Sequence, residues 1–286
     1  MFSSKKNKEP IEPQYYVSPT GMPTYNYKVY HMTKMEKIAY FMAAFVVGAI
    51  VGYLFYGGIG KDDLGDATTV TYVCNVIVCV LVGGIAGKMF LPARTQQLML
   101  KHKNELRMQF REMLDALATS IGSGKNIIDS FQSAYTDLGI IYNEDAHIIK
   151  ELAVILNGIN NNIDIEKSLM DMGIRSGIDD IISFANVFET CYRKGGNIKD
   201  VIKNTQQIIN EKMEVQMDIE TIVTGSKNES NIMTVMPIAL IGVIKLMSPE
   251  FSANFVTPVG IISTTIAIAL FAVARVVGKK VLDIKV

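Results

Sequence analysis

Four long stretches of the chain carry almost no charge, and this feature limits the possible folds more than any other. Charged residues are absent from 38–60, 67–87 and 251–274, and Lys245 is the only one within 230–249. At 1.5 Å of rise per residue, about 20 apolar residues in a helix cross the roughly 30 Å hydrocarbon layer of a bilayer. The sequence therefore predicts an all-α, polytopic membrane protein with four transmembrane helices, at 38–60, 67–91, 230–249 and 251–277.

The charged residues that flank these runs are unevenly distributed. The loop between the first two runs is acidic, with Asp62, Asp63 and Asp66 beside Lys61. Basic residues gather before the first run, after the second and after the fourth: Lys28, Lys34, Lys37, Lys88, Arg94, Lys101, Lys103, Arg275, Lys279 and Lys280. Because basic flanks stay on the cytoplasmic side of a membrane, we expect both ends of the chain in the cytoplasm. The cytosolic segments would be 1–37, 92–229 and 278–286.

The segment before the first span, 1–37, mixes proline with tyrosine. Its apolar run starts too late for a cleavable signal, and no small-residue cleavage site follows a short apolar core. Such a composition is typical of a chain that buries little surface. We expect a disordered or loosely docked tail.

The long segment between the second and third spans has a helical pattern. Its apolar residues recur with a period of 3.6, and strand-like alternation is almost absent. Residues 88–229 hold 16 basic and 20 acidic residues, a net charge of −4, whereas a nucleic-acid module is usually basic. We expect no nucleic-acid partner and a cytosolic antiparallel bundle of six helices, at 93–121, 127–138, 144–157, 165–172, 178–193 and 198–228.

Three of these predicted helices start with similar sequences. The starts are Gly124-Lys125-Asn126-Ile127, Asn162-Ile163-Asp164-Ile165 and Gly195-Gly196-Asn197-Ile198. Glycine two residues before the cap allows a positive φ as the preceding helix ends. Asparagine or aspartate then accepts hydrogen bonds from the free N–H groups of the first turn. The pattern predicts a stop followed at once by a new helix start.

The first of these starts, SIGSGKN at 120–126, invites comparison with a phosphate-binding loop. That loop requires G-x-x-x-x-G-K-[ST] between a strand and a helix. Thr119 stands where the first glycine is needed, Asn126 stands where the Mg²⁺-binding hydroxyl is needed, and the preceding run is helical. The sequence therefore argues against a nucleotide site.

The sequence also contains no recognisable motif for catalysis or metal binding. The three histidines, His31, His102 and His147, are far apart in the sequence, and no G-x-S-x-G element is present. The four spans contain no aspartate or glutamate. We therefore predict no catalytic, cofactor-binding or metal-binding residues, and a protein that is not an enzyme.

From about Arg107 onward, a series of short motifs follows in a characteristic order. They are LDALA at 114–118 with Gly124, YRKGGNI at 192–198, TGSKNES at 224–230, Met236-Pro237, and VLDIKV at 281–286. In order and spacing they are similar to the type II secretion F-domain family, and within it to the TadB-like proteins of Tad/Flp pilus assembly.

The resemblance implies a non-enzymatic platform protein in the lipid bilayer of the inner cell membrane. Its expected partners are a hexameric cytosolic secretion ATPase, a second F-domain protein of the TadC-like kind, and pilin subunits, in a homo- or hetero-oligomer. The motion of the ATPase would be passed to the spans that lift pilin from the membrane. The residues expected to shape the structure or to dock a partner are Gly124, Arg193, Lys194, Gly195, Gly196, Asn197 and Pro237, the last by kinking or loosening the third span.

Two other classes of function remain open. A small-molecule transporter or channel component would line its path with polar groups, for which Asn75, Thr68, Thr69 and Thr71 are the available residues. A membrane enzyme would need a reactive site, and none is recognisable. The platform is the interpretation that the sequence favours.

Overall fold

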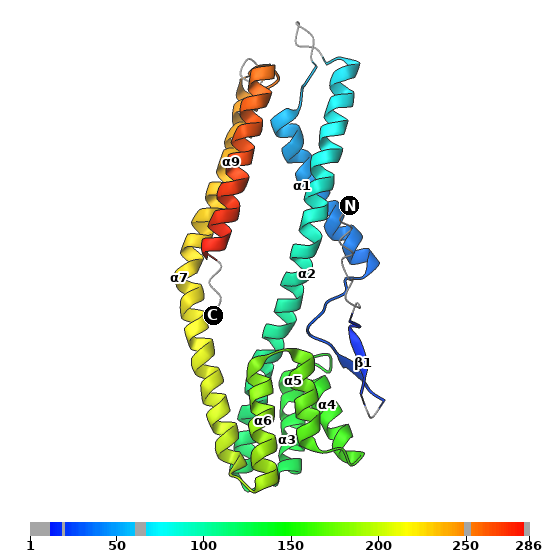
Figure 1. The fold of residues 1–286 in the computed structure, drawn as a ribbon, viewed down its shortest axis with the longest axis vertical. Helices are drawn as coiled ribbons and strands as arrows, with labels where there is room; N and C mark the ends of the chain where they lie inside the picture. The colour runs from blue at the N-terminus through cyan, green and yellow to red at the C-terminus, as the bar shows by residue number, and fades with distance from the viewer. Residues whose placement is uncertain (1–11, 19–20, 61–66, 249–252, 283–286) are drawn as a thin grey trace, which may run out of the picture. The chain divides into compact units, whose positions relative to one another are not determined.

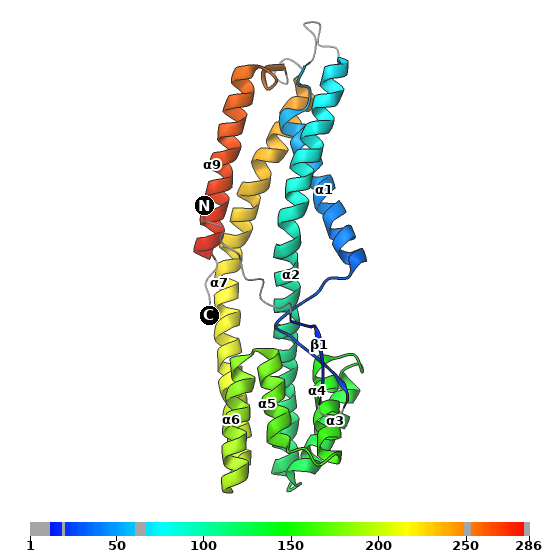
Figure 2. The ribbon, with the colours of Figure 1, turned by 45° about the vertical axis from the view of Figure 1, so that its right-hand side comes forward.

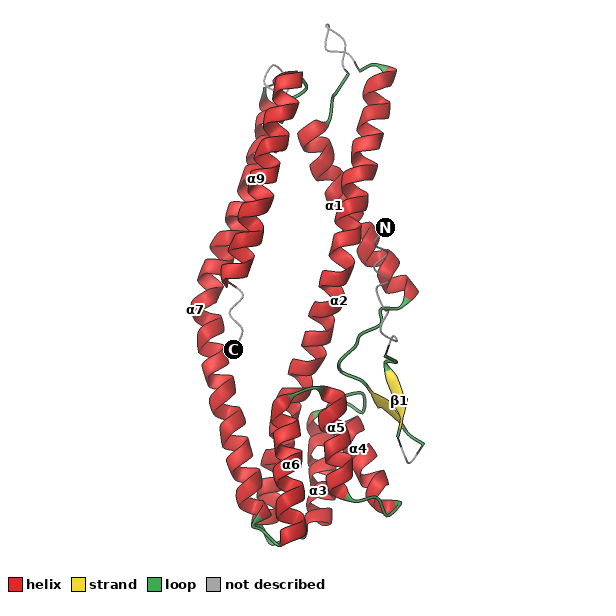
Figure 3. Cartoon of the chain, viewed as in Figure 1, coloured by secondary structure: helices red, strands yellow, loops and turns green. Residues whose placement is uncertain are grey.

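The chain is described by a computed structural model that covers residues 12–18, 21–60, 67–248 and 253–282. The acidic loop residues Asp62, Asp63 and Asp66 and the terminal residues 283–286 lie outside the described part. Within it the fold is helical apart from one short hairpin (Figures 1 and 3). The elements are β1 Tyr15–Val17, β2 Pro23–Tyr25, α1 Lys34–Tyr56, α2 Thr69–Gly122, α3 Ile127–Ile141, α4 His147–Asn160, α5 Ile165–Ser176, α6 Asp179–Lys194, α7 Ile198–Met247 and α9 Pro258–Leu282.

The chain divides into two compact units. The helical unit comprises Met1–His31 and Thr95–Glu214, and the membrane unit comprises Met32–Arg94 and Val215–Val286. The helices α2 and α7 contribute residues to both units, since each runs without interruption across a boundary. The second span therefore continues into the helical unit as one helix, and the last helix of that unit continues into the third span.

The membrane unit has four helices that are long and apolar enough to cross a bilayer. They are Lys34–Tyr56, Thr69–Gly122, Ile198–Met247 and Pro258–Gly278. The first ends at Tyr56 rather than at residue 60, because a turn with positive φ at Gly58 and Gly60 follows. The fourth begins at Pro258 rather than at residue 251, with proline in the first helical turn, where its missing N–H is not needed.

Glycines set the contact between α1 and α2. A Cβ added at Gly48 would lie 2.7 Å from the Cβ of Ala86, and one added at Gly83 would lie 2.8 Å from the carbonyl oxygen of Phe45. Gly52 and Gly87 occupy the equivalent positions four residues further along each helix, so both helices carry G-x-x-x-G. Small residues at this spacing let two helix backbones approach closely in a membrane.

The helical unit has an apolar core drawn from all of its helices. Figures 1 and 2 show α3, α4, α5 and α6 clustered together. The core side chains with almost no exposed surface include Leu106, Phe110, Met113, Leu114 and Leu117 of α2, Phe131 of α3, Ile148, Leu152 and Ile155 of α4, Leu169 and Met172 of α5, Ile181, Phe184 and Phe188 of α6, and Ile202 and Ile209 of α7. Ile208 of α7, by contrast, is half exposed, at 51 %.

The segment before the first span is ordered where it is described, which corrects the expectation of a disordered or loosely docked tail for residues 12–18 and 21–31. β1 and β2 pair as an antiparallel hairpin that places Tyr15 opposite Tyr25. The hairpin lies beside α4 (Figure 2), and Tyr27 is 1 % exposed within the core. The described tail is thus part of the helical unit.

Candidate functional site

The three similar helix starts share a positive φ two residues before the cap, which the sequence predicts for the two glycines. Gly124 has φ 92°, Gly195 has φ 75°, and Asn162 is the one non-glycine residue with positive φ in the described part, at 58°. No atom lies within 4 Å of a Cβ added at Gly124 or Gly195. The two glycines are therefore required by the backbone conformation and not by crowding.

The caps differ among the three starts. The side chain of Asn126 accepts a hydrogen bond from the N–H of Asp129 at 2.8 Å, and Asn197 accepts one from the N–H of Asp200 at 3.4 Å. In both starts the asparagine amide also donates to the aspartate carboxylate. Asp164 makes no capping hydrogen bond and instead pairs with Lys167 at 2.7 Å. The predicted cap is confirmed for the two asparagines and is wrong for Asp164, because the lysine competes for its carboxylate.

The turn between α6 and α7 holds most of the residues predicted to shape the structure or to dock a partner. Gly196 donates its N–H to the carbonyl of Cys191 at 2.7 Å, which closes the end of α6. Lys194 is exposed. Arg193 is also half exposed, but its Nε lies 3.2 Å from Oε1 of the buried Glu166. Among the described residues the second oxygen of Glu166 has no hydrogen-bond partner, so Arg193 is more than a surface charge.

Pro237 lies inside α7, which continues through it to Met247. It borders a cavity of about 410 Å³ in the membrane unit. The residues that line this cavity are almost all apolar: Val51, Gly52, Phe55, Tyr56, Val82, Pro237, Ile238, Ile241, Ala267, Ile268 and Phe271. Pro237 belongs to the membrane unit, whereas Gly124 and the 193–197 turn belong to the helical unit.

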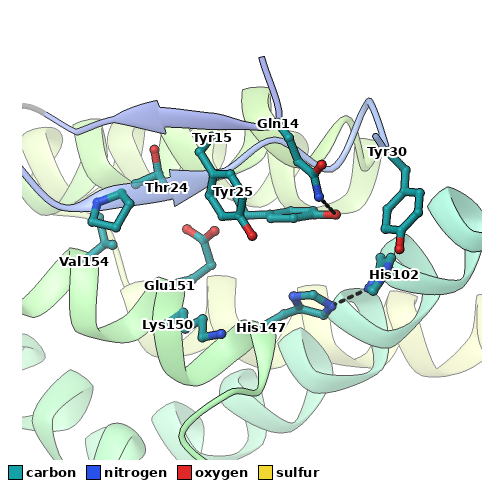
Figure 4. A pocket seen from close by; sticks show the side chains of 11 residues that line it. Gln14, Tyr15, Thr24, Tyr25, Tyr30, His102, His147, Lys150, Glu151 and Val154 are labelled. Carbon is teal, nitrogen blue, oxygen red and sulfur yellow. Dashed lines mark hydrogen bonds between the residues drawn. The ribbon is translucent and has the colours of Figure 1, made fainter. Parts of the chain in front are cut away.

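A second cavity, of about 310 Å³, lies in the helical unit where the hairpin meets α2 and α4 (Figure 4). Two histidines line it. Nδ1 of His102 and Nε2 of His147 are 3.0 Å apart. Tyr25 and Tyr27 pack against the His147 ring, with centroid distances of 5.8 and 5.1 Å, and Tyr30 stacks on His102 at 5.5 Å.

The environment of His147 holds it in the neutral form. Burial, followed by the charges of His102 and Lys150, lowers the pKa of His147 to about 4 despite the opposite effect of Glu105. At neutral pH the ring therefore carries one nitrogen with a free lone pair. Sequence reasoning missed this pair because His102 and His147 are 45 residues apart.

Next to the histidines lies a buried ion pair. Arg175 donates two hydrogen bonds to the carboxylate of Glu151, at 2.8 and 2.6 Å, and a third to the backbone carbonyl of Tyr25 at 2.9 Å. The hydroxyl of Tyr27 donates to Glu151 at 3.1 Å. Burial raises the pKa of Tyr27, and the charge of Glu151 raises it further. The hairpin segment is thus fixed to α4 and α5 by charge-assisted hydrogen bonds between buried side chains.

A further charge cluster joins three helices of the unit. Asp180 of α6 accepts two hydrogen bonds from Arg107 of α2, at 2.9 and 2.6 Å, and one from Lys212 of α7. Burial raises the pKa of Asp180, but the hydrogen bonds from Lys212 and Arg107 more than offset this, so the net pKa is lowered. The carboxylate therefore stays charged and ties α2 and α7 to α6.

Comparison of the chain with family models, with curated proteins and with solved structures found no match. The fold and the contacts above are therefore the observations on which a function can be argued.

Proposed function

We propose that the protein is an inner-membrane platform of a Tad/Flp-type pilus or type II-like secretion machine, which couples a cytosolic secretion ATPase to pilin assembly. In this proposal the helical unit is cytosolic and both ends of the chain lie in the cytoplasm. The partners are a hexameric ATPase, a second F-domain protein and pilin subunits.

The observation that carries the proposal is the continuity of two helices. Both α2 and α7 contain a candidate membrane span and also a segment that packs in the core of the helical unit. A helix hydrogen-bonded along its whole length transmits a displacement better than a loop does. A force applied to the helical unit would therefore reach the spans without passing through a flexible linker.

The internal bracing of the helical unit supports the same role. The Glu151–Arg175 pair and the Asp180 cluster join α2, α4, α5, α6 and α7 by charged hydrogen bonds. Buried networks of this kind favour one arrangement when all members are paired. A unit that receives force from an ATPase needs such bracing, because a loose bundle would deform instead of moving as one body.

Membrane purification tests the proposal directly. The full chain, carrying a tag without histidine, is isolated from its native membrane after crosslinking, and we expect a secretion ATPase and a second F-domain protein to accompany it. The chain alone should hydrolyse no ATP. Recovery of neither partner, or ATP turnover that is lost in Lys125→Ala, would contradict the proposal.

A matched pair of variants then locates the docking surface. Lys194→Glu reverses a charge in the 193–197 turn, and Lys125→Glu makes the same change in the related turn before α3. We expect only Lys194→Glu to reduce recovery of the ATPase, with the thermal unfolding midpoint unchanged in both. Equal recovery from the two variants would remove the 193–197 turn as the docking surface.

The membrane unit offers little support for the alternative function as a transporter. The cavity beside Pro237 has an almost wholly apolar lining, in which the Tyr56 hydroxyl already hydrogen-bonds Thr265 at 2.9 Å. A path for polar solutes needs polar groups along its wall. Uptake of a labelled solute by vesicles that contain only this protein would reopen the alternative.

A further inference from the structure

Three side chains beneath the hairpin place metal-binding atoms within 4.8 Å of one another. They are His102 and Glu105, three residues apart on α2, and His147, the first residue of α4. Nδ1 of His102 is 3.0 Å from Nε2 of His147, and Oε2 of Glu105 is 3.7 Å from each of these nitrogens. The three atoms therefore form an isosceles triangle with the two nitrogens at its shorter side.

The size of this triangle matches a metal ion. A point equidistant from the three atoms lies about 2.0 Å from each, and zinc binds imidazole nitrogen and carboxylate oxygen at about 2.0–2.2 Å. Two imidazoles and one carboxylate suit zinc and its neighbours in the first transition row better than Mg²⁺ or Ca²⁺, which prefer all-oxygen sites. We propose that His102, Glu105 and His147 form a binding site for one divalent transition-metal ion of the Zn²⁺ class.

The surroundings allow an ion to enter and to complete its coordination. The side chains of His102, Glu105 and His147 are 27 %, 35 % and 17 % exposed, so the site is sheltered without being sealed. Both histidines line the 310 Å³ cavity, which leaves room for a water molecule in a fourth position (Figure 4). Three protein ligands with one open position are typical of zinc sites that exchange or react rather than of closed structural sites.

The local charges are compatible with a divalent cation. Glu105 supplies one negative charge at the site, and the exposed Lys101 lies 3.7 Å from its other oxygen. Lys150 also lines the cavity, and it is held by Asp145 at 2.8 Å. Glu151 adds a further carboxylate on the cavity wall, although Arg175 balances it.

A bound ion would have a structural consequence. It would replace the single His102–His147 hydrogen bond by three metal–ligand bonds that join α2 to the start of α4. Tyr25, Tyr27 and Tyr30 pack on the two imidazole rings, so fixing the rings also fixes the surface on which residues 21–31 rest. An ion that binds only the folded state raises the free energy of unfolding by RT ln(1 + [ion]/Kd), so the stabilisation grows with the free ion concentration.

Zinc titration of the full chain tests the site. The protein is purified in detergent with a tag that contains no histidine, stripped with a chelator, and titrated with ZnCl₂ against a chromophoric competitor. We expect one Zn²⁺ per chain and a higher thermal unfolding midpoint. His102→Gln and His147→Gln should each weaken binding by at least about 100-fold, because removing a ligand exceeds the effect of altering its supporting contacts.

Two further variants keep the result interpretable. Glu105→Gln changes a partly exposed residue and should weaken binding by about 10-fold or more without altering the apo unfolding midpoint. His31→Gln removes the only other histidine, which lies in the segment after the hairpin, and should leave zinc affinity unchanged. Zinc binding by the wild type that survives in His102→Gln, His147→Gln and Glu105→Gln, or no zinc binding by the wild type at micromolar concentration, would overturn the proposal.

Discussion

Gly124 and Gly195, at helix ends of the helical unit, stand in open space, whereas Gly83 and Gly87 of α2 are in close contact with α1. Gly124 and Gly195 have positive φ and no neighbour within 4 Å of an added Cβ. A Cβ added at Gly83 or Gly87 would instead lie within 3 Å of the backbone or ring of a phenylalanine. The same residue type thus serves backbone conformation in one unit and helix proximity in the other.

The interactions that stabilise the two units also differ. The helical unit buries large apolar side chains together with ion pairs, as expected where water drives apolar groups inward. In the membrane unit that driving force is absent between spans, so close approach and dispersion replace it. A substitution should therefore act through lost charge pairing in one unit and through added volume in the other.

The largest expected effect tests the buried charge of the helical unit. Arg175→Ala leaves the buried Glu151 without its counter-charge, and we expect a loss of about 3–5 kcal/mol in the free energy of unfolding. Chemical denaturation of the full chain, followed by the fluorescence of its tyrosines, measures the loss. Lys150→Ala, which breaks an exposed pair with Asp145, is the control and should leave stability unchanged. A similar loss in both variants would contradict the central role of the buried pair.

The next prediction tests close approach in the membrane unit. Gly83→Ala forces a Cβ against the carbonyl of Phe45 at 2.8 Å, so α1 and α2 must separate, at a cost of about 2 kcal/mol. The adjacent change Gly84→Ala meets no atom within 4 Å and should be neutral or slightly stabilising. Unfolding of both variants in mixed detergent micelles, followed by helicity, gives the comparison. Equal stability of the two variants would contradict the proposed difference between the units.

The features of the fold that could be predicted from the sequence are those that depend on residues close together in the chain. The helix starts at Ile127, Ile165 and Ile198 were predictable because their signals lie within four residues of each start. The spans were predictable because they depend on composition alone. The G-x-x-x-G spacing of Gly48 and Gly52 was also visible in the sequence, and it would have pointed to the α1–α2 contact.

The ordered hairpin and the histidine pair could not be predicted in this way. Tyr27 is buried because its hydroxyl meets Glu151, 124 residues away, and His102 meets His147 only when α2 and α4 pack. Neither partner is indicated by a local pattern. The same limit explains Arg193, whose role depends on the buried Glu166 of another helix.

A smaller effect is expected from glycines within the helical unit, where a positive φ requires glycine at one position and not at another. Gly195→Val places a β-branched residue at φ 75°, and we expect a loss of more than about 1 kcal/mol in the free energy of unfolding. Gly139 lies inside α3 with no neighbour within 4 Å of an added Cβ, so Gly139→Ala should be stabilising by about 0.5–1 kcal/mol. Shifts of opposite sign in the thermal unfolding midpoints of the two variants would support a conformational role for Gly195. A loss in both would indicate crowding that the structure does not contain.

The smallest effects distinguish the two kinds of helix start. Asn126→Ala removes a capping hydrogen bond of 2.8 Å to the N–H of Asp129, and we expect a loss of about 1 kcal/mol. Asp164→Ala should cost measurably less, because its carboxylate caps no N–H group and pairs only with the exposed Lys167.

Asn162 sharpens this last comparison, because it holds the positive φ that glycine holds in the other two starts. Asn162→Gly should therefore raise or preserve stability by relieving the backbone, whereas Gly124→Asn should lower it slightly. Urea denaturation midpoints of the four variants, measured under one condition, decide the matter. If Asp164→Ala costs as much as Asn126→Ala, the three starts use one capping mechanism after all, and the competition from Lys167 is not what distinguishes them.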